Sequence, residues 1–304
     1  AAFIVLDLRL SPGLRKYSSS FHVFSRLFSF GGWITISSIV GPLLVYLDRF
    51  LIGLLLSIAA VAYYSTPYEV IARLIIIPAS LTMTLFPAFS ALEGVKDRDR
   101  LGVLFARSIK YILLGLGPLV LVIGLFAKDI LQIWLGSDFA MKSTAVLQIL
   151  CLGILINSLA HAPFALLQGV GRPDLPAKFH LLELPLYVGG AWLLINKWGI
   201  AGAAGAWTLR VTVDALLLFA ATIKVYRFSP RLLVTNGVMV AFLVILGLVG
   251  LACASKRLAA TFPLWVQVLI MVGLFGLFAW FCWWKVLELS EREVLVKTVR
   301  LWRR

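Results

Sequence analysis

The sequence predicts an all-α polytopic membrane protein with about eight transmembrane helices. Of the 304 residues, 61% are hydrophobic and only 14% are charged, and the mean hydropathy is +0.98. An ordinary soluble domain is roughly 45–50% apolar and about 25% charged. A soluble fold of this length could not bury so much apolar surface, so the composition favours a membrane protein.

Eight apolar runs are long enough to cross a bilayer, because a transmembrane helix needs about 20 mostly apolar residues. The runs are residues 27–56, 62–90, 108–135, 143–168, 180–196, 200–223, 232–254 and 263–284. Prolines recur inside them and favour bent helices around an internal cavity over a rigid anchor. These prolines are Pro42, Pro67, Pro78, Pro87, Pro118, Pro163 and Pro185.

The positive charges lie mainly in short segments between the runs. The net charge is +14, but no basic face interleaved with stacking aromatic residues appears, which argues against a nucleic-acid partner. When the segments are assigned to alternate sides of the membrane, one side holds twenty of the 28 Lys and Arg residues and the other side holds five. This asymmetry predicts that both ends of the chain are cytoplasmic.

The sequence offers no pattern for a metal or a cofactor. The three cysteines lie singly in apolar runs, and the three histidines are far apart, without the spacing of a disulfide framework or a metal site. We therefore expect neither a cofactor nor a bound metal. The chain opens with AAFIVLDLRL and no initiator methionine, and we interpret it as the C-terminal part of a longer protein.

Four ionisable residues lie inside the first two predicted helices. They are Asp48, Arg49, Glu69 and Arg73. A charge within a membrane span costs at least a few kcal/mol and usually faces a partner or a cavity. Neighbouring residues on a helix diverge by about 100°, so we do not expect Asp48 and Arg49 to be each other's partner.

Folding the hairpin about residue 59 or 60 brings the four charges to a similar depth. Either the i, i+4 pair Glu69–Arg73 or the crossed pairs Asp48–Arg73 and Arg49–Glu69 satisfy them. Two interpretations of this predicted cluster remain open. The cluster locks two helices together, or an arginine exchanges its carboxylate for an anionic ligand, which its planar guanidinium binds well.

Weaker candidates lie farther along the chain. Arg210 and Asp214 form another i, i+4 couple, which we interpret as structural. His161 is a candidate proton relay, and Glu183 sits near the inner end of the fifth run. A lone polar residue in such a helix is more often an interhelical hydrogen-bonding group than a ligand site.

The basic tail begins with Ser290 and Glu293, which fit a capping box. Its apolar residues then predict a stripe beside the basic ones, as in a helix that lies on the anionic inner leaflet. A solvated tail is the alternative. The stripe consists of Val294, Leu295, Val299 and Trp302.

Residues 20–225 resemble the Wzx-type polysaccharide-biosynthesis flippases of the multidrug/oligosaccharidyl-lipid/polysaccharide exporter superfamily. The matching elements of the first hairpin are Gly31-Gly32-Trp33, Asp48-Arg49, Tyr63-Tyr64, Tyr68-Glu69, Arg73 and Phe86-Pro87. GSDFAMKSTAVLQIL, LLQGVGRPDLPAK and WGIAGAAGAW follow. Ser38 stands where many relatives are expected to have Asn, which puts a role for that side chain in doubt.

The resemblance implies two lobes of about six helices that face one another across a central cavity and work by alternating access. This chain would supply residues 1–26 as the inter-lobe segment, 27–225 as the second lobe, and 226–304 as two additional helices with a basic tail. The implied activity is movement of an undecaprenyl-diphosphate-linked oligosaccharide across the bacterial or archaeal plasma membrane, in contact with membrane lipids. Proton or sodium coupling is compatible with this family. We carry ligand contact over to Arg49 and Arg73, with Asp48 and Glu69 as their switching partners.

Three other functions compete with this interpretation. A multidrug or cation antiporter of the same superfamily would favour a carboxylate-rich cavity, whereas here arginines match the acids. A membrane-embedded glycan-assembly enzyme would place carboxylates or a basic motif in a sizeable outer loop, and the outer connections here are short. A purely structural membrane subunit is the third alternative.

Overall fold

The computed structural model describes residues 21–226, 228, 234–259, 261–288, 291–293 and 297, with side chains from residue 28 onward. Every described secondary-structure element is a helix. The elements are α2 (Phe21–Leu55), α3 (Ile58–Ala72), η2 (Arg73–Ile75), α4 (Ile76–Gly94), α5 (Arg98–Leu125), α6 (Ala127–Leu135), α7 (Ser137–Gly169), α8 (Asp174–Tyr226), α10 (Val238–Leu258), α11 (Leu264–Phe281) and η3 (Cys282–Val286). Segment 1–20 and the tail residues Ser290, Val294, Leu295, Val299 and Trp302 lie outside the described residues.

Seven stretches of the described chain are long and apolar enough to cross a membrane. The longest of them, α8, consists of two helices, because the backbone at Gly199 has φ 59° and ψ −138° and leaves the helix. A Cβ at Gly202 would overlap the Leu194 carbonyl oxygen eight residues earlier, a closeness that a straight helix excludes. The chain therefore reverses at Gly199, between the fifth and sixth predicted runs, and the prediction of an all-α polytopic membrane protein is confirmed.

The predicted third run, 108–135, is wrong as a single helix. The chain leaves helical geometry at Phe126 and continues as the short helix α6. The 28 residues of α5 span about 42 Å at 1.5 Å per residue, which is enough to cross a bilayer alone.

A second break lies between α3 and α4, where η2 forms a short 3₁₀ turn. Pro78 stands early in α4. Proline has no N–H to donate to the Leu74 carbonyl, and its ring clashes with that oxygen, so the helix tightens or kinks there. Arg73 therefore stands at the C-cap of α3, where the 3₁₀ turn begins.

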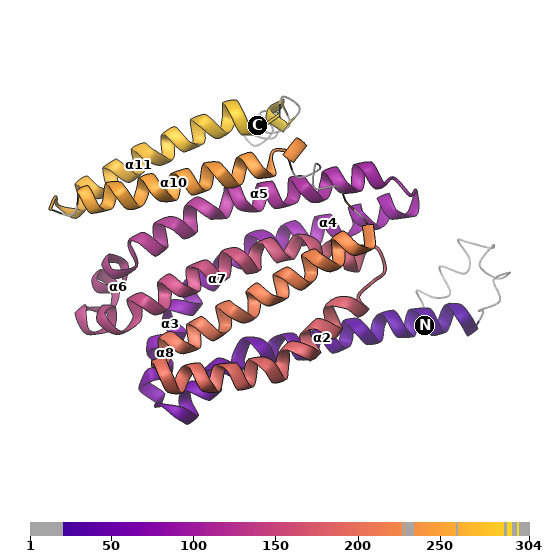
Figure 1. Ribbon diagram of the computed structural model, residues 1–304, viewed down its shortest axis with the longest axis horizontal. Coiled ribbons are helices and arrows are strands. Elements are labelled where there is room, and N and C mark those ends of the chain that lie inside the picture. The colour runs from indigo at the N-terminus through magenta and orange to yellow at the C-terminus, as the bar shows by residue number, and fades with distance from the viewer. Residues whose placement is uncertain are drawn as a thin grey trace, which may run out of the picture.

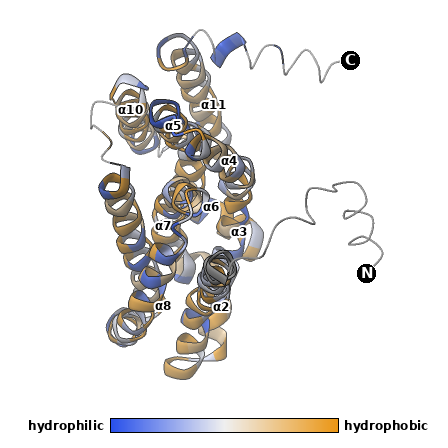
Figure 2. Cartoon of the chain, turned by 90° about the vertical axis from the view of Figure 1, so that its right-hand side faces the viewer, coloured by the Kyte–Doolittle hydropathy of each residue, from blue (hydrophilic) through white to orange (hydrophobic). Residues whose placement is uncertain are grey.

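Long helices run side by side in a bundle (Figure 1). α10 packs on α5 and α11, at the edge of the bundle opposite α2 (Figure 1). The main core lies among α2, α3, α7 and α8, where Trp207, Tyr64, Leu44 and Ile52 are fully buried. Hydrophobic residues predominate along most helices (Figure 2), and many large hydrophobic side chains are exposed, as expected for helices that face lipid.

The N-terminal half of α5 is tied by ion pairs to the segment that follows α11. Lys110 is buried and lies 2.7 Å from the Glu291 carboxylate, and Arg107 lies 2.6 Å from Glu288. The twenty positive charges assigned to one side of the membrane include Lys110, which lies inside α5 and is paired there with Glu291. The network fixes the last described helices against the rest of the bundle.

Candidate functional site

Asp48 of α2 is fully buried and is held on two sides. It accepts a hydrogen bond from the Tyr64 hydroxyl of α3 and one from the Arg49 backbone N–H at 2.7 Å. The Arg49 guanidinium bends back to 3.6 Å from the same carboxylate. Our expectation that neighbours on a helix cannot be partners is therefore wrong here, because the long arginine side chain folds back over the preceding residue.

Arg49 also makes a shorter ion pair with the next helix. Its Nη2 lies 2.9 Å from Glu69 Oε1, so the structure contains the predicted crossed pair Arg49–Glu69. The guanidinium donates to the Val45 carbonyl at 2.8 Å and lies 4.4 Å from the centre of the Tyr68 ring. The Arg49 guanidinium is therefore held between two carboxylates, those of Asp48 and Glu69, and against the face of the Tyr68 ring.

The Glu69 side chain differs from Asp48 because it is 63% exposed. It borders a cavity of about 550 Å³, lined by Ser65, Thr66, Glu69, Val70, Arg73 and Trp134. Arg49 thus connects a buried, fixed carboxylate with a carboxylate that stands at an open cavity. Glu69 can therefore separate from Arg49 and stay in contact with the cavity, whereas separation of Arg49 from Asp48 would take an ion-pair partner away from a buried carboxylate.

Arg73 borders the same cavity and makes no ion pair within the described part of the chain. The i, i+4 pair Glu69–Arg73 and the crossed pair Asp48–Arg73 are therefore not formed there. The 3₁₀ turn that starts at Arg73 changes the turn geometry on which an i, i+4 pair depends. An unpaired guanidinium beside a cavity is a ready partner for an anion.

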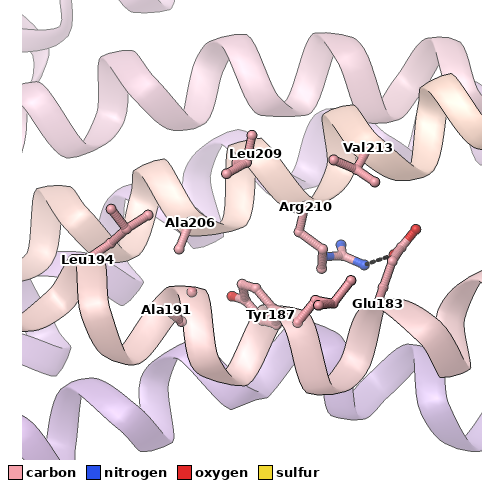
Figure 3. Close-up of a pocket in the computed structure, with 10 residues that line it drawn as sticks. Glu183, Tyr187, Ala191, Leu194, Ala206, Leu209, Arg210 and Val213 are labelled. Atoms are coloured by element: carbon pink, nitrogen blue, oxygen red, sulfur yellow. Dashed lines mark ion pairs between the residues drawn. The ribbon is translucent and has the colours of Figure 1, made fainter.

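A second charged group joins the two arms of α8. Arg210 of the second arm lies 3.7 Å from Glu183 of the first arm, and both line a cavity of about 120 Å³ together with Tyr187 and Ala191 of the first arm (Figure 3). The predicted couple Arg210–Asp214 is wrong, because Asp214 lies instead 3.9 Å from His180. Neither Glu183 oxygen has a hydrogen-bond partner among the described residues. This cavity and the cavity beside Arg73 share no lining residue.

His161 lines a third cavity, of about 160 Å³, together with His180 and Asp214. Its Nδ1 lies 3.3 Å from the Thr82 hydroxyl. The role of a proton relay stays a prediction. In the described part of the chain, no group of three or more His, Cys, Asp or Glu side chains could hold a metal ion.

Three aromatic residues of the site were not predicted from the sequence to take part in it. Tyr64 and Tyr68 are four residues apart, a spacing that puts both on one helix face, and this signal could have indicated their joint burial against Asp48 and Arg49. Trp134 carries no comparable signal in the sequence, because the apolar run 108–135 continues through α6. Its position at the cavity depends on the break at Phe126.

Comparisons with known proteins point to one family. Residues 3–144 match the model of a family described as polysaccharide biosynthesis protein. The chain is 36% identical over 198 residues to a Shigella flexneri protein whose name describes an O-antigen transporter, covering 65% of this chain and 47% of that protein.

Two further relatives are more distant. A Haloferax volcanii protein named as the low-salt glycan biosynthesis flippase Agl15 is 28% identical over 209 residues, which cover 69% of this chain and 44% of that protein. The lipopolysaccharide biosynthesis protein WzxC of Escherichia coli K12 is 24% identical over 199 residues, which cover 64% and 39%. The chain thus spans less than half the length of these relatives. The resemblance of this multi-pass membrane protein to the polysaccharide-biosynthesis flippases of the Wzx type is confirmed.

Proposed function

We propose that this chain is part of a transporter that moves a polyprenyl-diphosphate-linked oligosaccharide across the membrane for cell-surface polysaccharide synthesis. The matched family and the names of the relatives from Shigella flexneri and Haloferax volcanii support this proposal. These relatives are named as a transporter and a flippase, which favours transport over an enzymatic activity. The substrate, in this proposal, approaches through the lipid and meets the charges of α2 and α3.

The observation that carries the proposal is the Arg49–Glu69 ion pair at the edge of an open cavity. Arg49 exchanges the exposed Glu69 for the diphosphate of the substrate, while Asp48 keeps the guanidinium in place. Arg73, unpaired among the described residues, contacts the same anionic head group. Of the two expected switching partners, we assign the exchange to Glu69 and the fixed role to Asp48.

The wider architecture is part of the same proposal. Residues 27–225 form the second of two lobes, preceded by the inter-lobe segment 1–26 and followed by two additional helices in 226–304. The protein resides in the plasma membrane with both ends of this chain in the cytoplasm, a topology favoured by the excess of Lys and Arg on one side. Proton or sodium movement drives the cycle.

The test is export in cells that lack the chromosomal copy and carry the full-length protein with Arg49→Ala. Surface polysaccharide should disappear while the amount of protein in the membrane stays unchanged. Arg100→Ala is the matched control, because Arg100 is 81% exposed and, among the described residues, pairs only with Asp97, the N-cap of α5. Full export by the Arg49→Ala protein would remove Arg49 from the mechanism.

A further inference from the structure

The cavity beside Arg73 has an aromatic wall that the charges alone do not explain. Trp134 of α6 lines this cavity together with residues of α3 and η2, and 57% of its surface is exposed. The neighbouring Ile133 lines a different, apolar groove against α11. Adjacent helical residues diverge by about 100°, so α6 directs its tryptophan to the polar cavity and its isoleucine to the apolar groove.

Polar side chains line the cavity along one stripe of α3. Ser65, Glu69 and Arg73 follow at four-residue intervals, a spacing that covers about 12 Å of helix. The Thr66 hydroxyl borders the cavity beside them and makes no hydrogen bond within the described part of the chain. Only one Glu69 oxygen is engaged, by Arg49. The stripe therefore offers donors and acceptors with unused capacity.

An exposed tryptophan face beside several hydrogen-bonding groups suits a sugar ring. The C–H face of a pyranose packs on the electron-rich face of an aromatic ring, and its hydroxyls bind carboxylate, hydroxyl and guanidinium groups. The cavity volume of about 550 Å³ lies within the roughly 300–1,000 Å³ of small-ligand sites. The stripe is long enough to hold a sugar and a diphosphate side by side.

We propose that Trp134, Thr66 and Glu69 form a subsite for a sugar of the substrate, next to the diphosphate held by Arg49 and Arg73. This inference rests on the proposed function and names how the glycan part is recognised. When Arg49 leaves Glu69 for the diphosphate, the released carboxylate accepts hydrogen bonds from the sugar hydroxyls. One exchange therefore prepares both halves of the site.

A tryptophan near a helix end also occurs as an anchor at the membrane interface, and the chain provides a matched control for that role. Trp198, beside the reversal at Gly199, is also 57% exposed and lies against the Lys197 side chain, 4.8 Å from its ammonium. It lines none of the described cavities. If Trp134 were only an anchor, replacing either tryptophan would have the same effect.

The experiment measures binding of two lipids to the purified full-length protein in detergent. One probe is polyprenyl diphosphate that carries a single N-acetylglucosamine, and the other is polyprenyl diphosphate without sugar. Trp134→Ala should weaken binding of the sugar-bearing lipid about tenfold and leave the sugar-free lipid unchanged. Trp134→Phe should remain within about twofold of the original protein, because the stacking face is kept, and Trp198→Ala should bind both lipids normally.

The outcomes separate this inference from the proposed function. If Trp134→Ala weakens binding of both lipids equally, or of neither, the sugar subsite is overturned. The proposal that Arg49 binds the diphosphate would not be contradicted by either result. If Arg49→Ala loses binding of both lipids and Trp134→Ala loses binding of neither, the result would support the diphosphate site and not the sugar subsite. If the unaltered protein binds neither lipid, the proposed function and the subsite both fail.

Discussion

The Arg49 guanidinium on α2 lies 2.9 Å from the Glu69 carboxylate on α3, twenty residues farther along the chain. The same guanidinium lies 3.6 Å from the buried Asp48. Arg49 thus has one partner, Asp48, that is buried in the protein and another, Glu69, that lines a cavity. This asymmetry supports partner exchange over a static clamp.

The first prediction concerns the support of Asp48. Tyr64→Phe removes the hydroxyl that donates to this buried carboxylate, and the loss of one such hydrogen bond should cost about 1–3 kcal/mol of stability. Thermal unfolding of the detergent-solubilised protein measures the effect. Tyr63→Phe is the control, since its hydroxyl binds the exposed Asp138, and its melting temperature should barely change. Equal melting temperatures for both variants would contradict the buried role of Asp48.

The second prediction concerns the close crossing of α7 and α8. A Cβ at Gly153 would lie 2.5 Å from the Trp207 ring and 2.7 Å from the Thr208 hydroxyl, so Gly153→Ala should cost about 1–3 kcal/mol through overpacking. Gly189→Ala, where nothing lies within 4 Å of the added methyl, should be neutral. The melting temperatures of the two variants test this, and a stable Gly153→Ala protein would show that the helices are not packed this closely.

The third prediction concerns the ion-pair network between α5 and the segment that follows α11. Burial raises the pKa of Glu291, but hydrogen bonds from Lys110, Tyr111 and the Glu288 backbone outweigh it and bring the pKa below the ordinary value of 4.5. A carboxyl group with a lowered folded-state pKa stabilises the protein above its ordinary pKa and loses that contribution as the pH falls through the folded-state value.

Thermal unfolding between neutral pH and about pH 3 should therefore show an acid-dependent loss of stability that is smaller in Glu291→Gln. That variant should also begin less stable at neutral pH, because it removes the charge that pairs with the buried Lys110. Glu293→Gln, in the same short segment, is the control and should keep the original pH profile. An unchanged profile in Glu291→Gln would show that Glu291 is not a source of acid sensitivity.

Much of the fold follows from local sequence properties. Apolar run length predicts the membrane crossings, and the predicted reversal between the fifth and sixth runs agrees with the turn at Gly199. The break at Phe126 was missed because α5 and α6 are both apolar and adjoin without a Gly or Pro between them. Run length and hydrophobicity report whether a segment is buried in lipid, and they do not report where a helix changes direction.

The candidate site was predictable only in part. Hairpin geometry placed Arg49 near Glu69, since depth in two antiparallel helices follows from residue count. It could not show that Arg73 makes no ion pair among the described residues, which depends on the 3₁₀ turn before Pro78. Nor could it select Glu183 as the partner of Arg210, which depends on contacts between the two arms of α8. Side-chain pairing is decided by rotation and packing of helices, which a single sequence specifies only weakly.

The most direct test of partner exchange is the affinity of the full-length protein with Glu69→Gln for sugar-free polyprenyl diphosphate. Removing the competing charge from Arg49 should make this lipid bind several times more tightly, whereas Arg49→Ala should abolish binding. A static clamp predicts the opposite pattern, in which Glu69→Gln lowers stability and leaves the affinity unchanged. Tighter binding by Glu69→Gln would support the exchange, and an unchanged or weaker affinity would contradict it.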